Sequence, residues 1–355
     1  FIERQVVSGS MLRGIHHWGA SVMVVLVMAH MIRVFTMGAY KYPREANWLL
    51  GVGLFAIVMG FSFTGYLLPW DQKAYWATEV GTNIAGTTPF IGGILVKVLR
   101  GGSQLGAATL TRFYALHVLL LPLTFVALVG LHLALVIRQG IAGRASDLED
   151  GAPPRTNDAE YPAYYKAAYE RTKMADVRFW PDIIAKDAVT AMVVIVALVL
   201  LAKYAGTPLE APADPSDTSY VPRPEWYFLP FFQLLKLVPG TMEAAVAVGV
   251  PAALMVAMLM LPFYDRASTR SFARRPLARV ALTALLGGSG LLIGASVSED
   301  TGEGTPPEVG RPLSSMERAG RALYRQQQCG SCHLIVGDLS LEKTEDAPDA
   351  PELTE

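Results

Sequence analysis

The chain has 355 residues, of which 52% are hydrophobic, and its formal net charge is −1. This balanced charge provides no general basic field, so it argues against a nucleic-acid-binding protein. The hydrophobic residues are gathered in long blocks, which is typical of a membrane protein and not of a water-soluble enzyme.

Five of these blocks contain no Asp, Glu, Lys or Arg, and each is about long enough to cross ~30 Å of hydrocarbon as a helix. They are residues 15–32, 48–68, 113–137, 244–264 and 280–298. A sixth block, residues 188–202, is shorter, so its helix must extend outward to include Lys186, Asp187 or Lys203. The sequence therefore predicts an all-α, multi-span bundle with six crossings.

The arrangement along the chain predicts five regions. They are a histidine-rich core at 1–137, a polar linker at 138–180, three further crossings within 181–298, a flexible Gly/Pro/Glu-rich linker at 299–312, and the start of a small soluble domain at 313–355. Lys and Arg concentrate after the first, third and fifth crossings, which predicts that these loops are cytoplasmic. Residue 1 is Phe, so we expect the natural protein to begin earlier.

Four of the six histidines form two spaced pairs, His16 with His30 and His117 with His132. The pairs are 14 and 15 residues apart, so on a helix both members face the same way within about 40–60° and lie roughly 21–22 Å apart along the axis. Two such helices side by side would offer a two-histidine clamp at two levels, the geometry for two stacked six-coordinate haems. A single helix–helix hydrogen bond is the alternative for any one histidine.

Glycines and arginines near these positions are compatible with the haem interpretation. Gly51 and Gly65 are also 14 residues apart and would leave room for a macrocycle at two levels, although ordinary small-residue packing explains them equally well. Arg13, Arg33 and Arg112 each lie three to five residues from a paired histidine. They could pair with haem propionates or extend to the membrane interface.

Two cysteines, Cys329 and Cys332, are followed directly by His333 in a C-x-x-C-H motif. Two thiols can add to haem vinyl groups while the histidine ligates iron, so the motif predicts a covalently attached haem c, with zinc binding or redox chemistry as alternatives. Residues 334–355 contain no Met or His. The sixth iron ligand is therefore expected beyond residue 355, on another chain, or nowhere.

Two further segments contain candidates for quinone chemistry. Glu225 and Tyr227 belong to a Pro-Glu-Trp-Tyr segment at the predicted outer surface, where a carboxylate among aromatic rings suits quinol; an interfacial helix start with aromatic residues is the alternative. Asp187, with Lys186 beside it, is expected at the inner membrane boundary, where it would supply a proton to quinone. The alternative for Asp187 is an acid in the first helical turn.

Four motifs together resemble cytochrome b of the quinol–cytochrome c oxidoreductases: RGIH at 13–16, GYLLPWDQ at 65–72, TRFYALH at 111–117 and PEWY at 224–227. The resemblance implies that His16 and His117 ligate a low-potential haem on the positive side of the membrane. It implies that His30 and His132 ligate a higher-potential haem on the cytoplasmic side. Glu225 would belong to the quinol-oxidising site.

The same resemblance implies a complex that translocates protons. One quinol electron would pass to a Rieske iron–sulfur partner and onward to a cytochrome acceptor. The other would cross through the two b haems to reduce quinone at an inner site. The fused haem c would take the high-potential electron onward on the outer, periplasmic side. Lipids and a second copy of the complex, as a homodimer, are further expected partners.

The chain also departs from the family. The 15-residue histidine spacing and the LPWDQ motif look like the b6f branch, with residues 158–298 resembling its subunit IV, whereas Lys186 and Asp187 look like the bc1 branch. The family's first helix is missing, as is the Cys that holds an extra haem in the b6f branch, so that haem is left undecided. A dihaem anchor of a dehydrogenase or hydrogenase, and a haem-free scaffold or transporter, are the rival functions.

Overall fold

The computed structural model describes residues 2–143, 145–153, 159–172, 179–207, 209–215, 220 and 223–300. This part of the chain is helical and contains no strand. Its membrane-crossing elements are α2 (Gly9–Thr36), α3 (Glu45–Tyr66), α6 (Ala107–Ala115) continued by α7 (Leu121–Gln139), α10 (Ile184–Tyr204), α12 (Gly240–Tyr264) and α13 (Pro276–Asp300). All six predicted crossings are confirmed by helices that are long and apolar enough to span a membrane.

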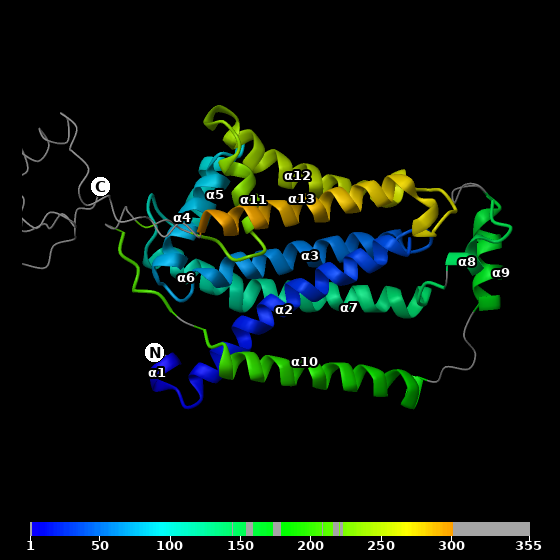
Figure 1. The fold of residues 1–355 in the computed structure, drawn as a ribbon, viewed down its shortest axis with the longest axis horizontal. Coiled ribbons are helices and arrows are strands. Elements are labelled where there is room, and N and C mark those ends of the chain that lie inside the picture. The colour runs from blue at the N-terminus through cyan, green and yellow to red at the C-terminus, as the bar shows by residue number, and fades with distance from the viewer. Residues whose placement is uncertain are drawn as a thin grey trace, which may run out of the picture.

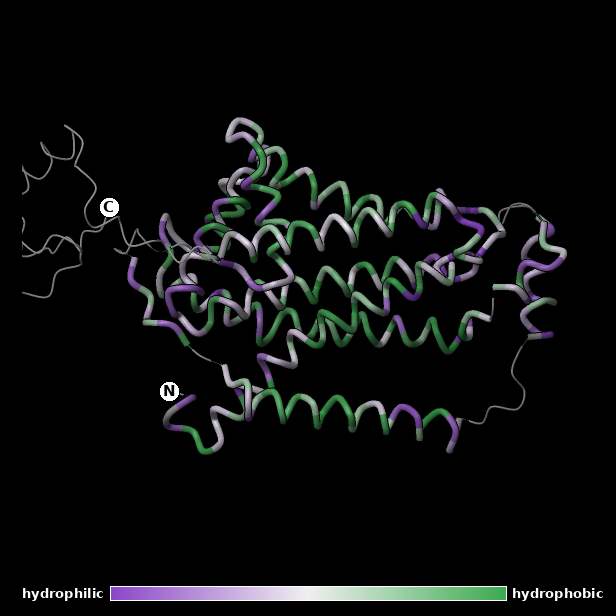
Figure 2. Tube along the Cα trace, viewed as in Figure 1, coloured by the Kyte–Doolittle hydropathy of each residue, from purple (hydrophilic) through white to green (hydrophobic). Residues whose placement is uncertain are grey.

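The crossings run along the long axis of the molecule (Figure 1). Apolar residues dominate their middle parts and polar residues gather toward both ends (Figure 2), as a bilayer requires. The block at 188–202 is lengthened in both directions, so Lys186, Asp187 and Lys203 all lie within α10. The protein is therefore a multi-pass membrane protein.

Shorter elements occupy the two ends of the bundle. We call one end the Glu225 end; it carries α1 (Ile2–Gln5), α4 (Gln72–Gly86), α5 (Gly92–Arg100) and α11 (Leu229–Lys236), at the left of Figure 1. The opposite end, the Asp265 end, carries α8 (Ala145–Glu149), α9 (Tyr161–Thr172) and the 3-10 turn Phe272–Arg274. A π turn, Phe179–Ile183, precedes α10. Four of these short helices, α4, α5, α8 and α9, lie outside the apolar blocks from which the sequence predicts helices.

The Glu225 end joins the first and second halves of the chain through backbone contacts. The amide of Gln72 donates to the carbonyl of Ala211 at 2.9 Å, and the amide of Ala213 donates to the carbonyl of Trp70 at 3.1 Å. Asp71 begins α4 by accepting a hydrogen bond from the amide of Ala74 at 2.9 Å, an N-cap that satisfies one of the free donors of a helix start.

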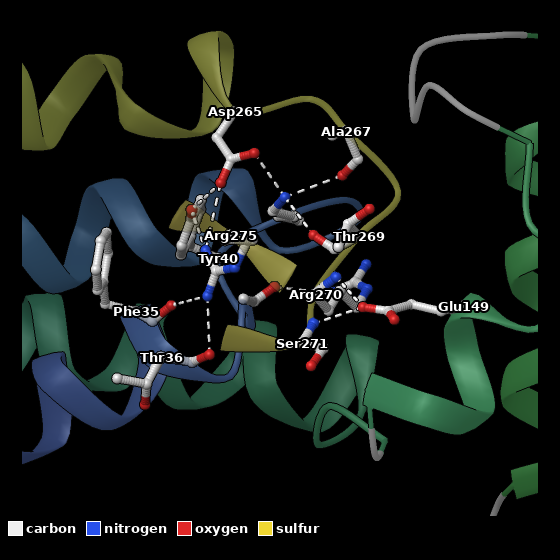
Figure 3. A network of polar contacts seen from close by, with 12 residues as sticks. Phe35, Thr36, Tyr40, Glu149, Asp265, Ala267, Thr269, Arg270, Ser271 and Arg275 are labelled. Atoms are coloured by element: carbon white, nitrogen blue, oxygen red, sulfur yellow. Dashed lines mark hydrogen bonds and ion pairs between the residues drawn. The ribbon is translucent and has the colours of Figure 1, made fainter. Parts of the chain in front are cut away.

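The Asp265 end joins the same two halves through buried charges (Figure 3). The ammonium group of Lys41 is fully buried and contacts Asp265 at 2.6 Å, and it donates to the carbonyls of Ala267 at 2.9 Å and Thr269 at 2.7 Å. Tyr40 donates a further hydrogen bond to Asp265. Burial favours a higher pKa for Asp265, but the hydrogen bonds from Lys41 and Tyr40 outweigh it and hold the pKa below its usual value.

Two arginines complete this network. Arg275 donates to the carbonyls of Phe35 at 2.6 Å and Thr36 at 2.8 Å, and so satisfies free acceptors at the end of α2. Arg270 is buried and donates to the carbonyls of Gly38 at 2.8 Å and Tyr42 at 2.7 Å. The loop between α12 and α13 is thereby fixed against the loop between α2 and α3.

Candidate functional site: two histidine pairs and a carboxylate

The histidines of α2 face those of the α6–α7 crossing at two levels. The ring centroids of His16 and His117 are 6.0 Å apart, and those of His30 and His132 are 6.4 Å apart. Two imidazole nitrogens that each lie about 2 Å from one metal ion place their ring centroids roughly 6 Å apart. Both pairs therefore have the spacing of two histidines that could ligate one metal ion.

These sites supply two ligands each. Among the described residues, no group of three or more His, Cys, Asp or Glu could hold a metal ion. A bare ion would therefore lack ligands at either level, whereas the iron of a haem is already bound by the porphyrin and would need only two histidines from the protein. The donor set fits haem.

A π turn brings His117 and His132 onto one face. His117 lies in the turn Leu116–Leu120, where the amide of Leu121 donates to the carbonyl of Leu116. Pro122, which has no N–H to donate, follows in the first turn of α7. A π turn holds one residue more than an α turn, so it absorbs the extra residue of the 15-residue spacing and matches it to the 14-residue spacing on α2.

Gly51 and Gly65 of α3 lie against the second histidine of each pair. A Cβ atom added at Gly65 would lie 2.5 Å from Cε1 of His117, and one added at Gly51 would lie 3.7 Å from Cε1 of His132. Since 2.5 Å is too close for two carbon atoms, the absence of a side chain at Gly65 is required by the position of the His117 ring. At Gly51 the same contact would be ordinary.

The three candidate arginines make different contacts. Arg13 forms an ion pair with Glu3, and Arg112 donates to the carbonyls of Lys97 and Val98. Arg33 is exposed near the end of α2. Their pairing with haem propionates stays a prediction.

Glu225 lies just before α11 and is held by a lysine from the other half of the chain. Its carboxylate forms an ion pair with Lys73 of α4 at 3.1 Å, and the Lys73 ammonium also lies 5.6 Å from the ring centroid of Tyr66. The Tyr66 hydroxyl donates to the carbonyl of Arg223 at 3.2 Å. Lys73 was not singled out from the sequence, because no local pattern connects it to a residue 152 positions away.

Aromatic residues follow the carboxylate. The rings of Trp226 and Tyr227 are 5.3 Å apart and those of Tyr227 and Phe228 are 4.9 Å apart. Burial, together with the nearby charge of Glu225, raises the pKa of Tyr227 to about 12, against a hydrogen bond with Ser62 that lowers it. The Tyr227 hydroxyl therefore remains protonated near neutral pH and can donate a hydrogen bond.

The remaining predicted residues are not brought into this arrangement. Lys186 and Asp187 are exposed in the first turns of α10, and among the described residues no side chain pairs with either. This placement is compatible with an acid in the first helical turn. Cys329, Cys332, His333 and the regions at 301–312 and 313–355 lie outside the described residues.

A helical membrane bundle with two histidine pairs at separate levels defines a class of membrane proteins suited to hold two haems. A family model described as "Cytochrome b(N-terminal)/b6/petB" matches residues 21–212, and one described as "Cytochrome b(C-terminal)/b6/petD" matches residues 212–302. The chain belongs to the cytochrome b family.

Individual relatives agree with this assignment. The "Menaquinol:cytochrome c reductase cytochrome b subunit" of Geobacillus thermodenitrificans is 48% identical over 144 residues, which are 40% of this chain and 64% of the relative. The "Cytochrome bc complex cytochrome b subunit" of Chlorobaculum thiosulfatiphilum is 36% identical over 75% of this chain and 58% of its own length. A solved structure, "Hyperthermophilic respiratory Complex III", has a TM-score of 0.69 at 25% identity and covers 92% of this chain and 78% of its own.

Proposed function

We propose that the chain is the cytochrome b subunit of a proton-translocating quinol–cytochrome c oxidoreductase in a bacterial cytoplasmic membrane. The observation that carries the proposal is the pair of histidine clamps, with ring centroids 6.0 and 6.4 Å apart, at two levels of one bundle. The names of the relatives, a menaquinol:cytochrome c reductase subunit and a cytochrome bc complex subunit, support the same activity. A Rieske iron–sulfur protein and a cytochrome acceptor would be the partners.

The histidines would hold two haems b, one between His16 and His117 and one between His30 and His132. When bound, these haems would supply one-electron transfer between the two faces of the membrane. The chain would orient both ligands of each haem through α2 and the α6–α7 crossing, and it would surround them with apolar helices that exclude water.

Quinol oxidation would occur at the Glu225 end, which we place on the outer side. A quinol gives up two electrons and two protons when it becomes quinone. Glu225 would accept one hydroxyl proton, with Tyr227 packing near the ring as an aromatic wall and hydrogen-bond donor. One electron would leave to the Rieske partner and the other would cross the membrane.

Quinone reduction would occur toward the opposite face, where it consumes two electrons and two protons. Asp187 would supply one of these protons, with Lys186 as its neighbour in sequence. The C-x-x-C-H motif would attach a haem c through Cys329 and Cys332, with His333 as an iron ligand. A pyridine haemochrome spectrum tests the cofactor set: b and c bands together are expected, b alone would match a dihaem anchor, and neither would match a scaffold.

The Glu225 role is tested by Glu225→Gln. We expect quinol-driven reduction of the b haems, measured with the quinone-reducing site blocked, to slow by roughly 10²-fold or more. All haem bands should remain, because Glu225 lies outside both histidine clamps. Glu243→Gln is the matched control, since Glu243 is an exposed carboxylate in the first turn of α12 at the same end of the bundle. A wild-type rate in Glu225→Gln would contradict the proposed site.

A further inference from the structure

The ring of His117 has a hydrogen-bond partner that no haem-ligand motif identifies. Nδ1 of His117 lies 3.1 Å from Oγ1 of Thr64, a buried residue of α3. The Thr64 hydroxyl has a single proton, and its shortest contact as a donor is to the carbonyl of Gly60 at 2.8 Å. The hydroxyl oxygen is then left to accept, so Nδ1 of His117 carries the ring proton.

This proton assignment fixes the other ring nitrogen. A neutral imidazole carries one proton, so Nε2 retains the free lone pair that a metal ligand needs. The backbone carbonyl of Phe61 also faces the His117 ring, which places a second acceptor near it. Thr64 therefore selects the tautomer of His117 that can bind iron.

The second histidine pair has the same glycine and backbone carbonyl beside it as the first pair, but it has no counterpart of Thr64. Gly51 lies against His132 as Gly65 lies against His117, and the Asn47 carbonyl faces His132 as the Phe61 carbonyl faces His117. In each case the carbonyl belongs to the residue four positions before the glycine. Nδ1 of His132 is nevertheless buried without a side-chain hydrogen-bond partner among the described residues.

The difference originates in the residue directly before each glycine. Thr64 precedes Gly65, and Leu50 precedes Gly51, at the equivalent position 14 residues earlier. Leucine offers no oxygen to an imidazole N–H. One residue on α3 thus distinguishes the surroundings of two otherwise similar ligand histidines.

We infer that Thr64 is a positioning residue that lowers the reduction potential of the haem held by His16 and His117, while Leu50 leaves the other haem without this effect. A hydrogen bond from Nδ1–H to an acceptor makes the imidazole a stronger donor through Nε2. A stronger donor stabilises ferric iron more than ferrous iron, and second-shell hydrogen bonding is one of the factors that set haem potentials. The inference rests on the proposed haem ligands.

The test is an equilibrium redox titration of the complete complex carrying Thr64→Val, which keeps the size of the side chain and removes the acceptor oxygen. At a fixed ambient potential, the ratio of oxidised to reduced haem at the His16–His117 site should fall about three- to tenfold, or about 30–59 mV at 59 mV per decade for one electron. The other haem should titrate as in the wild type. Thr64→Ser, which keeps the oxygen, should restore the wild-type potential.

Leu50→Val is the matched control, because it changes side-chain size at the equivalent position without removing a hydrogen bond. An equal shift of its own haem in Leu50→Val, an equal shift in Thr64→Ser, or no shift in Thr64→Val would each overturn the inference. Should Thr64→Val fail to retain the haem, Thr64→Ala is titrated under the same criteria. The haem assignment is checked separately by His117→Leu, since retention of both haems there would refute the ligand proposal whatever Thr64 does.

Discussion

The two histidine pairs differ more than their common spacing suggests. The rings of His16 and His117 are inclined by 32°, whereas those of His30 and His132 are inclined by 76°. His117 also lies in a π turn and contacts Thr64, while Nδ1 of His132 has no side-chain partner among the described residues. A repeated ligand pattern therefore fixes where two haems would bind, and the neighbouring residues make the two sites unequal.

The largest expected effect is the loss of a whole haem, and a different haem should be lost for each histidine pair. His16→Leu and His117→Leu should each remove one and the same b haem, and His30→Leu and His132→Leu should each remove the other, because leucine cannot ligate iron. Low-temperature difference spectra of the four variants measure this. His17→Leu is the control and should retain both haems, because His17 belongs to neither pair. Its ring centroid instead lies 5.4 Å from that of Trp18. Loss of different haems in His16→Leu and His117→Leu would contradict the pairing.

A second difference should appear at the glycines. Gly65→Ala places a Cβ 2.5 Å from His117, so we expect it to destabilise that haem site by about 1–3 kcal/mol of overpacking. Gly51→Ala places its Cβ at 3.7 Å from His132 and should retain its haem. Haem content per protein, measured for each b band, compares the two variants. Equal losses would mean that the two glycines have the same role.

The two ends of the bundle should also differ in stability. Lys41→Met removes a fully buried cation from Asp265 and should cost about 3–5 kcal/mol, the range for breaking a buried ion pair. Lys73→Met removes the partner of Glu225, in a pair whose lysine is 33% exposed, and should cost about 0–1 kcal/mol. Thermal unfolding in detergent, followed for both variants in one buffer, makes the comparison. A larger loss for Lys73→Met would contradict it.

The smallest effect is expected at Asp187. Asp187→Asn should slow reoxidation of the His30–His132 haem by quinone roughly two- to tenfold, below the ~10²–10⁴-fold contribution of a positioned general acid. We expect a small effect because the Asp187 side chain is exposed, so water can deliver protons to the quinone in its place. Single-turnover reoxidation after quinol reduction measures the rate, with Asp147→Asn, at an exposed carboxylate of α8 at the same end of the bundle, as the control. An unchanged rate would mean that Asp187 acts only as an acid in the first turn of α10 and not as a proton donor to quinone.

Sequence alone determined the crossings and the histidine pairs. Membrane helices follow from runs of apolar residues, and the members of a pair such as His16 and His30 lie on one helix, where periodicity fixes their relative positions. The PEWY segment likewise drew attention to Glu225 by its local composition. These features are readable because they depend on residues close together in the chain.

Only the tertiary structure decided what each of these residues contacts. Thr64 meets His117, Lys73 meets Glu225, and Lys41 meets Asp265 across separations of 53, 152 and 224 residues. The π turn that brings His117 and His132 into register also departs from the regular 100° per residue on which the sequence prediction depends. Helix periodicity orients side chains around a single axis, whereas the partner of a side chain depends on how separate helices pack, and no local pattern encodes that.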